Sequence, residues 1–596
     1  MEPVLINPAA NLPRTDYPRP QWKRGEWLSL NGEWDFAFDF GNSGVERGMV
    51  NGGEYPLKIL VPFCPESPLS GVGHTDFIPA VWYRRALHLQ EKPAGRAILH
   101  FGAVDYECSV WINGSLAGTH RGGYSSFEMD VTGLLRAGDN AIVVCAQDDP
   151  RSGRQPRGKQ SDRYVSYACS YTRTTGIWQT VWMEFVPDKY LLRAQMTPHA
   201  VDGALDVTIF SAGSGRGDCV RLTARYDGRV VGAARAHFAG DRAQAHLEVS
   251  EKHLWFPGEP ALYDLTIELL DGESVVDTIE SYFGLRDVAL TDRALTINGR
   301  PVFMRTVLDQ GFNPEGVYTG PSDEFLRRDI ELMQELGFNG ARLHQRVFEE
   351  RTLYWADRLG YLVWGEYADE FSLATAEAIE NFLPEWMDAV QRDFNHPALI
   401  GWCPLNETYH SMVLDEETHR IFYRVTKAID PTRPVIDASG GMHYDTDMFD
   451  VHDYEQDPEK LRACLAPMAE DPKAFHCPID RYVGRAPRRP IEYHGQPYWV
   501  SEYGGMFWNP NLKPGEEGWG YGDSCRAEEE FAARYEQLTA ALLEHPRVCG
   551  FCYTQVTDVE QEQNGLLFYD RTRKHPDWVY DRIRRANQAV AAIEKE

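Results

Sequence analysis

The sequence has no run of about 18 uninterrupted apolar residues, the length that a membrane-spanning helix needs. Residues 1–22 also lack the basic and apolar regions of a secretory signal peptide. Positive charge is scarce, since 60 Lys and Arg stand against 89 Asp and Glu and give a net charge of −29. Such a surface repels nucleic acids and anionic membranes. We therefore expect a soluble, cytoplasmic protein that binds neither.

The 11 cysteines do not form a disulfide framework, because they are scattered and many lie in apolar, strand-like runs such as AIVVCAQ (141–147). Cys549 and Cys552 form a CxxC motif, but no second pair stands at a zinc-ligand spacing. In a strand, the two thiols would face opposite sides. HExxH, GxSxG and a complete dinucleotide fingerprint are absent as well. The sequence thus predicts no metal and no cofactor.

The chain is long enough, at 596 residues, for several domains of roughly 100 to 300 residues each. Up to residue 186, short apolar and aromatic runs alternate with Gly, Asn and Asp turns, which is typical of a β-sandwich. A second such set predicts an immunoglobulin-like β-sandwich of about 100 residues. We place the domains at 1–186, 187–285 and 286–596.

The third domain has a different pattern, in which strand-like runs alternate with helical segments such as 322–337 and 529–545. The candidate strands lie within residues 302–311, 338–344, 361–367, 398–407, 434–440, 448–456, 496–505 and 550–558. Eight strands in this order predict a (β/α)8 TIM barrel.

Each candidate strand begins apolar and ends polar. LIGWC leads to Asn406 and Glu407, and PYWV leads to Ser501 and Glu502. Active sites of TIM barrels gather at the carboxyl ends of the strands. Hydrolysis of a glycoside with retention needs two carboxyl groups about 5 to 5.5 Å apart. Glu407 and Glu502 are candidates for this pair, although their spacing alone assigns neither role.

Other polar residues at strand ends compete for roles in the site. Asn406 could hydrogen-bond the sugar 2-hydroxyl group, and Tyr503 could assist Glu502. Carboxylates also stand at the predicted ends of other strands, namely Asp309, Glu366, Asp437, Asp450 and Asp453. These could be catalytic, bind sugar hydroxyls, or pair with Arg342 and Arg346.

Long motifs resemble glycoside hydrolase family 2 in the family's own order. Four of them resemble its sugar-binding jelly roll: LNGEWDF (30–36), VWYRR (81–85), FGAVDYECSVWING (101–114) and TGIWQTVW (175–182). Three more resemble its first barrel signature (338–366), its acid/base signature NHPALIGWCPLNE (395–407) and its nucleophile strand SEYGG (501–505). The resemblance implies a retaining exo-β-glycosidase with a jelly roll, an immunoglobulin-like β-sandwich and a TIM barrel.

The resemblance also implies roles for individual residues. Glu407 would be the general acid/base, Glu502 the nucleophile and Asn406 the partner of the 2-hydroxyl group. Arg342 would orient the nucleophile, and His452, in the run DVHDY, would lie near the pocket. On residue type alone, a single His on a strand is more often structural.

Two departures from the family concern the substrate. Where many members have His-Tyr-Pro, this chain reads Gln345, Arg346 and Val347, which places a cation near the pocket. Family β-glucuronidases carry an Asn-x-Lys clamp for the sugar carboxylate, where this chain has NGL at 564–566. The missing lysine favours a neutral sugar, and β-galactosides are our first expectation. The alternative is a β-uronidase, for glucuronides or galacturonides, in which the planar fork of Arg346 binds the carboxylate.

A third hypothesis is a sugar-binding protein that has lost catalysis. Retention of both Glu407 and Glu502 argues against it. In each case the expected partner is a small glycoside or an oligosaccharide. The sequence leaves open the sugar epimer, the aglycone, whether the protein forms a homo-oligomer and whether a metal ion supports the site.

Overall fold

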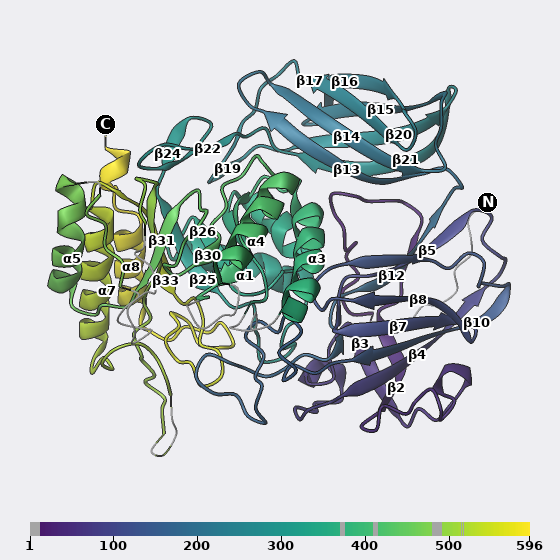
Figure 1. Ribbon diagram of the computed structural model, residues 1–596, viewed down its shortest axis with the longest axis horizontal. Helices are drawn as coiled ribbons and strands as arrows, with labels where there is room; N and C mark the ends of the chain where they lie inside the picture. The colour runs from purple at the N-terminus through teal and green to yellow at the C-terminus, as the bar shows by residue number, and fades with distance from the viewer. Residues whose placement is uncertain are drawn as a thin grey trace.

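The computed structural model describes residues 12–369, 376–408, 415–471, 473–478, 492–513, 515 and 518–595. Residues 1–11, on which part of the expectation about a signal peptide rests, lie outside these ranges. Two β-sandwiches and a barrel of parallel strands follow one another along the chain (Figure 1). The predicted fold class is therefore confirmed.

The first sandwich consists of two antiparallel sheets, with strand orders β1-β12-β5-β9 and β3-β2-β4-β10-β7-β8, and a short β11-β6 pair. On β2, Trp34 and Phe36 point into the core between the sheets, whereas Glu33, which precedes Trp34, is exposed, as strand alternation requires. The strands are β1 (Trp27–Ser29), β2 (Gly32–Phe38), β3 (Leu57–Val61), β4 (Ala80–Leu89), β5 (Arg96–Phe101), β6 (Val104–Asp105), β7 (Glu107–Ile112), β8 (Ser115–Arg121), β9 (Phe127–Asp130), β10 (Gly138–Gln147), β11 (Gly176–Ile177) and β12 (Val181–Val186).

The second sandwich packs the sheet β13-β14-β17 against the sheet β16-β15-β20-β21. Strict alternation on β17 buries Ala243, Ala245 and Leu247 against the other sheet and leaves the residues between them in solvent. The strands are β13 (Tyr190–His199), β14 (Ala204–Ala212), β15 (Asp218–Tyr226), β16 (Arg229–His237), β17 (Arg242–Glu248), β18 (Trp255–Phe256), β19 (Glu259–Pro260), β20 (Tyr263–Asp271) and β21 (Ser274–Phe283).

The barrel follows a small antiparallel sheet of β22 (Val288–Leu290), β23 (Leu295–Ile297) and β24 (Arg300–Val302). Seven parallel strands lie in the order β28-β27-β26-β25-β33-β32-β31, and β30 pairs in parallel with β29, which continues β28. Each of the eight predicted runs overlaps a strand of this barrel. The strands are β25 (Met304–Asp309), β26 (Gly340–Leu343), β27 (Leu362–Glu366), β28 (Leu399–Cys403), β29 (Leu405–Asn406), β30 (Ala438–Ser439), β31 (Phe449–Asp453), β32 (Tyr498–Gly504) and β33 (Val548–Thr554).

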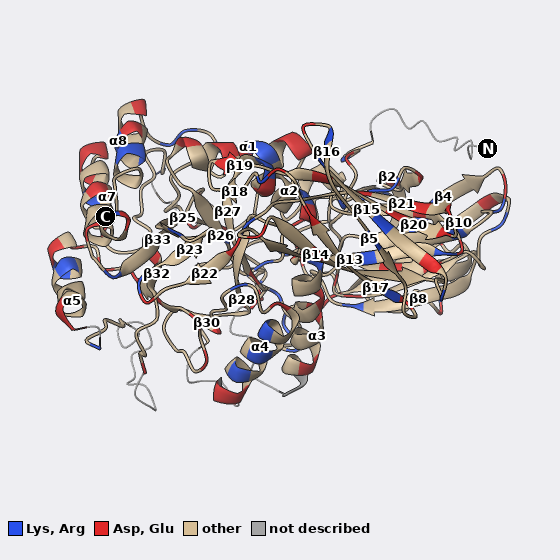
Figure 2. Ribbon diagram, turned by 90° about the horizontal axis from the view of Figure 1, so that it is seen from above, with Lys and Arg blue, Asp and Glu red and all other residues tan. Residues whose placement is uncertain are grey.

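Amphipathic helices cover the outside of the barrel. On α1, Leu326, Ile330 and Met333 are buried on one face, and the Ser322 hydroxyl caps the helix by accepting from the Phe325 N–H at 3.0 Å. Charges of both signs alternate along the outer helices, as Figure 2 shows for α4 and α5. Within the described ranges, no helix is both long and apolar enough to cross a membrane. The helices are α1 (Asp323–Glu335), α2 (Glu350–Leu359), α3 (Ala376–Asp393), α4 (Asp415–Ile429), α5 (Pro458–Glu470), α7 (Glu528–Leu543) and α8 (Asp577–Asn587).

Helix α3 joins the barrel to the first sandwich, which lies beside it in Figure 1. The buried Glu385 carboxylate on α3 accepts hydrogen bonds from the N–H groups of Tyr124 at 2.5 Å and Ser125 at 3.2 Å. Burial raises the pKa of Glu385 to about 7. This contact fixes the sandwich against the side of the barrel, so that its loops can reach the barrel mouth.

Candidate active site

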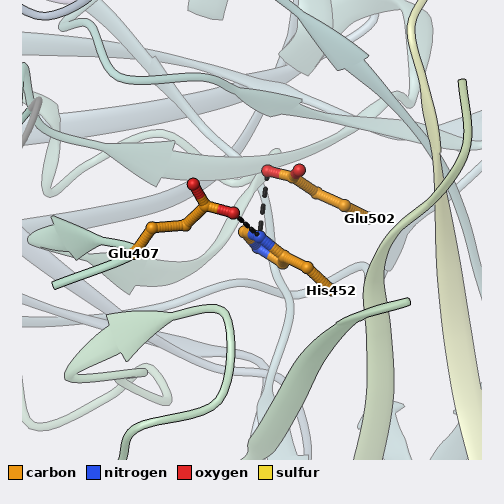
Figure 3. Close-up of side chains that lie close together, drawn as sticks. All are labelled: Glu407, His452 and Glu502. Carbon is orange, nitrogen blue, oxygen red and sulfur yellow. Dashed lines mark hydrogen bonds and ion pairs between the residues drawn. The ribbon is translucent and has the colours of Figure 1, made fainter. Parts of the chain in front are cut away.

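The ends of three barrel strands deliver acidic and basic side chains to one point in the barrel. Glu407 directly follows β29, His452 lies in β31 and Glu502 lies in β32 (Figure 3). The Nδ1 atom of His452 is 2.7 Å from Oε1 of Glu407, and its Nε2 atom is 3.4 Å from Oε1 of Glu502. One carboxylate oxygen of each glutamate and one ring nitrogen of His452 all lie within 4.8 Å of one another. The two predicted catalytic carboxylates are thus close together.

The backbone at Glu407 has an unusual conformation, with a φ of +49°. Left-handed backbone is uncommon for residues other than glycine and is found repeatedly at functional sites. The Glu407 N–H donates to the Ser439 carbonyl at 2.7 Å, which holds the residue against β30. Gly440 makes room for it, because a Cβ atom there would lie 3.2 Å from both the Glu407 and the His452 side chain.

Arg342, from β26, organises the base of this cluster and is fully buried. Its guanidinium donates to Oε1 of Glu502 at 3.0 Å, to Oδ1 of Asn406 at 3.2 Å and to Oε1 of Glu366 at 2.5 Å. Burial alone would lower the pKa of Arg342, but the charges of Glu366 and Glu502 raise it well above its ordinary value. The side chain is therefore a permanent cation that orients Glu502 and Asn406.

A second donor binds the other carboxylate oxygen of Glu502. The Tyr454 hydroxyl, just after β31, hydrogen-bonds Oε2 of Glu502 and also Oγ1 of Thr554 at 3.2 Å. The Tyr454 ring stacks on Tyr521, with ring centroids 3.4 Å apart. Sequence reasoning missed Tyr454, although it stands in the same DVHDY run as His452. Nothing in the run indicates which of its polar residues faces the barrel.

Glu366 and His344 form a layer beneath the nucleophile candidate. Glu366 accepts from Arg342, from Nδ1 of His344 at 3.0 Å and from the Gln345 N–H at 3.1 Å, so its oxygens serve to position neighbours. The Nε2 atom of His344 lies 4.0 Å from Oε1 of Glu502. Burial, followed by the charge of Lys159, holds the pKa of His344 well below its ordinary value. The ring is therefore neutral, and its place in the site was not predicted.

The three side chains in Figure 3 are also the candidate metal ligands of the described residues, because His and carboxylate groups form a common donor set. Their direct contacts with one another link both carboxylates through a single imidazole. An imidazole beside two carboxylates, one held by an arginine, is an arrangement suited to acid–base chemistry on a bound sugar.

Family models match all three parts of the chain. The TIM barrel domain of glycosyl hydrolases family 2 matches residues 288–510, its sugar binding domain matches 54–154, and a further model of the family matches 192–286. The chain belongs to glycosyl hydrolase family 2. It is a glycoside hydrolase.

Similar proteins include enzymes of more than one named activity. The β-glucuronidase of Felis catus is 27% identical over 466 residues, covering 70% of this chain and 69% of the relative. A β-galactosidase of Leuconostoc mesenteroides is 27% identical over 414 residues, covering 65% of this chain but 37% of the relative. The solved structure of a β-glucuronidase from an uncultured Clostridium species matches with a TM-score of 0.75 at 20% identity, covering 94% of this chain and 99% of that one.

Arg346 of this family 2 hydrolase does not lie beside the glutamates, contrary to the sequence-based hypothesis. Its guanidinium donates to the Gly311 carbonyl at 2.6 Å and the Tyr318 carbonyl at 2.5 Å. Its charge lies over the rings of Tyr318 and Phe348, 4.4 and 4.6 Å from their centroids. The two terminal nitrogens of the guanidinium are thus held by carbonyls of the loop that follows β25.

Asp309 and Tyr503 are also directed away from the cluster. Asp309 lines a cavity together with Arg346 and the buried face of α1. Its carboxylate accepts a hydrogen bond from the Gly311 N–H at 2.8 Å. Burial raises the pKa of Asp309 to about 6. The Tyr503 hydroxyl meets Oγ1 of Thr539 on α7 at 2.8 Å. Because neighbouring residues of a strand face opposite sides, Tyr503 points outward when Glu502 points inward. The predicted role of Tyr503 as a helper of Glu502 is therefore wrong.

The three remaining aspartates of the predicted strand ends have histidine and serine partners, not Arg342 or Arg346. Asp437 lies 2.7 Å from His443, and Asp450 lies 2.6 Å from the Ser439 hydroxyl. Asp453 lies 2.8 Å from His476. These carboxylates support the strands that carry the site.

The first sandwich reaches the barrel mouth of this family 2 hydrolase through the loop between β10 and β11. The Tyr171 hydroxyl hydrogen-bonds Oε2 of Glu562, which follows β33. Glu562 in turn accepts from Nδ2 of Asn564 at 3.0 Å, so the asparagine of the incomplete clamp is directed at this carboxylate. Burial raises the pKa of Glu562 to about 7, against the lowering effects of the Tyr171 hydroxyl and the Lys159 charge. Sequence reasoning did not find this contact between domains.

Proposed function

We propose that this family 2 hydrolase is a retaining exo-β-uronidase, which removes a terminal uronic acid from a β-linked glycoside. Glu502 attacks the anomeric carbon, while Glu407 protonates the leaving oxygen. Glu407 then takes a proton from water, which hydrolyses the glycosyl-enzyme ester and regenerates both carboxyl groups. Asn406, aligned by Arg342, binds the sugar 2-hydroxyl group.

The short separation of the two carboxylates carries the retaining mechanism. Oxygens of Glu407 and Glu502 lie within 4.8 Å of one another. Retaining glycosidases hold their carboxyl groups about 5 to 5.5 Å apart, whereas inverting enzymes leave about 6.5 to 9.5 Å for a water molecule between carboxylate and sugar. The separation here supports direct attack by a carboxylate.

The surroundings of the two glutamates support the division of roles. The Glu502 side chain is 5% exposed and receives hydrogen bonds from Arg342 and Tyr454, which fix the orientation of its carboxylate for attack. The Glu407 side chain is 25% exposed, which suits a group that must meet the leaving aglycone and the incoming water. Its contact with His452 supplies a partner for the proton that it exchanges.

The similarity to a β-glucuronidase supports a uronide substrate, because this match extends over most of the relative's length. The β-glucuronidase match covers 69% of that relative, whereas the β-galactosidase match covers 37%. The first expectation, a β-galactoside, remains a second candidate because Leu566 stands where a clamp lysine was expected and is fully buried. Both candidate activities use the same catalytic pair, Glu407 and Glu502.

A substrate panel tests the proposal. We expect nitrophenyl β-glucuronide or β-galacturonide to give the highest kcat/KM among matched β-glucuronide, galacturonide, galactoside, glucoside and mannoside. If the β-galactoside had the highest kcat/KM, the β-galactosidase hypothesis would replace the uronidase proposal. Sugar binding without hydrolysis of any of the five would support the non-catalytic hypothesis instead.

A further inference from the structure

A short segment with the sequence GWGYG, residues 518–522, lies between two loops at the carboxyl end of the barrel. The Tyr521 N–H donates to the Gly505 carbonyl, just beyond β32, at 2.7 Å. The Trp519 N–H donates to the Gln561 carbonyl, beyond β33, at 2.9 Å. The 518–522 segment is therefore fixed by backbone hydrogen bonds to the loops that follow β32, the strand of the candidate nucleophile, and β33.

Glycines allow this segment to approach the barrel closely. A Cβ atom at Gly520 would lie 2.8 Å from the Cα atom of Phe507. A Cβ atom at Gly505, the last residue of the SEYGG run, would lie 2.5 Å from Cδ2 of Tyr521 and 3.3 Å from Cε1 of Tyr454. Gly505 also has a φ of +61°, a conformation that glycine adopts without strain. The missing side chain at Gly505 thus leaves room for two tyrosine rings.

The Tyr521 ring packs on the residue that donates to the candidate nucleophile. Its plane is nearly parallel to that of Tyr454, at 6°, with ring centroids 3.4 Å apart. The Tyr454 hydroxyl hydrogen-bonds Oε2 of Glu502 and meets Oγ1 of Thr554 at 3.2 Å. The ring of Trp519 packs in turn on Tyr521, with centroids 4.9 Å apart. Because a stacked ring blocks movement perpendicular to its own plane, Tyr521 prevents Tyr454 from swinging towards it and away from Glu502.

We propose that Tyr521 is a positioning residue, which acts through Tyr454 to set the orientation of the Glu502 carboxylate. This inference rests on the proposed role of Glu502 as the nucleophile. Arg342 holds Oε1 of Glu502 at 3.0 Å, and the Tyr454 hydroxyl holds Oε2, so the two contacts together define the plane of the carboxylate. Attack on the anomeric carbon depends steeply on this orientation. Loss of the Tyr521 ring leaves the first contact in place and loosens the second.

The rate at which Glu502 is covalently labelled tests this role directly. The probe is the 2-deoxy-2-fluoro-β-glycosyl fluoride of the sugar that the wild type prefers. A carboxylate oxygen of Glu502 forms a bond to the anomeric carbon while the bond to fluorine breaks and fluoride departs, and the glycosyl ester accumulates because the fluorine at C2 slows its hydrolysis. Mass spectrometry of the intact protein gives the rate constant, and mass spectrometry of its peptides identifies the labelled residue.

Two variants of Tyr521 separate its ring from its hydroxyl group. For Tyr521→Leu, we expect the rate constant of labelling to fall about 10- to 100-fold, the range for a misplaced reacting group. Tyr521→Phe keeps the stacked ring and should recover most of this loss, to within about threefold of the wild type. Both proteins should still be labelled to completion. A purely structural effect would instead lower the fraction of protein that becomes labelled and leave the rate constant unchanged.

A double variant tests whether Tyr521 acts through Tyr454. If it does, then Tyr521→Leu should have little further effect once the Tyr454 hydroxyl is gone. The double variant Tyr454→Phe/Tyr521→Leu should therefore be labelled at a rate within about threefold of that of Tyr454→Phe alone. Two independent losses would multiply and would overturn the inference.

A stacked tyrosine far from the site provides a matched control. Tyr226, in β15 of the second sandwich, stacks on His253 with ring centroids 3.7 Å apart and an angle of 4° between the planes. Tyr226→Leu removes the same kind of contact and should leave the labelling rate unchanged. If Tyr521→Leu does not fold, Tyr521→Met conserves more of the side-chain volume but has no rigid ring, and its labelling rate should still fall by at least about threefold.

The outcomes distinguish the inference from the proposed function. Labelling of a residue other than Glu502 in the wild type overturns the nucleophile assignment, and this inference with it. If Glu502 is labelled in the wild type, and Tyr521→Leu (or Tyr521→Met in its place) is labelled at the wild-type rate, then the nucleophile assignment stands and the role of Tyr521 is overturned.

Discussion

The Nδ1 atom of His452 lies 2.7 Å from Oε1 of Glu407, and the other nitrogen of the same ring faces Glu502 at 3.4 Å. Burial alone would lower the pKa of His452, but the charge of Glu502 and the hydrogen bond to Glu407 raise it above its ordinary value. The imidazole therefore tends to hold a proton between the two carboxylates. We infer that His452 is a positioning residue, which fixes Glu407 and shares its proton.

Replacing His452 with Gln keeps a hydrogen-bonding side chain but removes the titratable ring. We expect kcat/KM to fall by up to about 100-fold, because Glu407 loses its fixed orientation. We expect a bell-shaped profile of kcat/KM against pH, in which the basic limb reports loss of the proton that Glu407 donates. In the variant this limb should move to higher pH, since Glu407 then faces Glu502 without a neighbouring cation. Profiles of kcat/KM against pH for both proteins measure this shift. An unmoved basic limb would limit His452 to a structural role.

Replacing Glu502 with Ala should abolish turnover of every substrate, because no carboxylate remains to attack the anomeric carbon. Azide can enter the vacated space and should restore formation of a glycosyl azide of inverted configuration. Proton NMR of the product establishes its anomeric configuration. A product of retained configuration would exchange the roles assigned to Glu502 and Glu407.

Replacing Glu407 with Ala should affect substrates according to their leaving groups. A dinitrophenyl glycoside departs without protonation and should keep much of its first-step rate, whereas an alkyl glycoside should lose most of its rate. Pre-steady-state release of the aglycone isolates this step. Equal losses for good and poor leaving groups would argue against the acid role of Glu407.

The part of the site that could be predicted from the sequence is the part that lies on strand ends. The carboxyl ends of parallel strands meet in a barrel whatever their loops do, so Glu407, Glu502 and Arg342 come together. Within a strand, the sequence does not tell which of two neighbouring polar residues faces inward, and Tyr503 was therefore misassigned. His344 and Tyr454 stood inside recognised runs, but a single His or Tyr has no distinguishing pattern.

The loops and the contacts between domains could not be predicted. Arg346 lies three residues beyond β26, where Gln345 has a φ of +48° and the turn decides the direction of the chain. Tyr171 and Glu562 are 391 residues apart in the chain, and no spacing indicates that they meet.

Matched variants of Tyr454 and Tyr503 test whether the first side chain points into the site and the second points away from it. Tyr454→Phe removes a donor to Glu502, and we expect kcat to fall about 10- to 100-fold, as for loss of a hydrogen bond to a charged group. Tyr503→Phe removes a bond to Thr539 on the far side of the strand and should cost about 0.5 to 1.5 kcal/mol of stability with unchanged kinetics. Steady-state kinetics and denaturant unfolding of both variants measure the contrast. Similar kinetic losses in the two variants would contradict the inward and outward placement.

The last prediction concerns the buried pair of His443 and Asp437, which supports β30 beside Glu407. Nδ1 of His443 lies 2.7 Å from Oδ1 of Asp437, and Nε2 lies 3.1 Å from Oδ1 of Asp450. Burial alone would lower the pKa of His443, but the charge of Asp437 raises it from 6.5 to about 10. Because the folded state holds this proton more tightly than the unfolded state, the stabilisation is complete below about pH 6.5 and is lost as the pH rises towards about 10.

Replacing His443 with Gln should therefore do two things. It should destabilise the protein by about 3 to 5 kcal/mol at neutral pH, because the buried Asp437 loses its charged partner. It should also flatten the fall in stability between about pH 6.5 and about pH 10, since the group responsible for that part of the slope is gone. Urea unfolding of both proteins at several pH values measures the two slopes. Equal slopes would mean that His443 does not carry a proton between Asp437 and Asp450 in the folded enzyme.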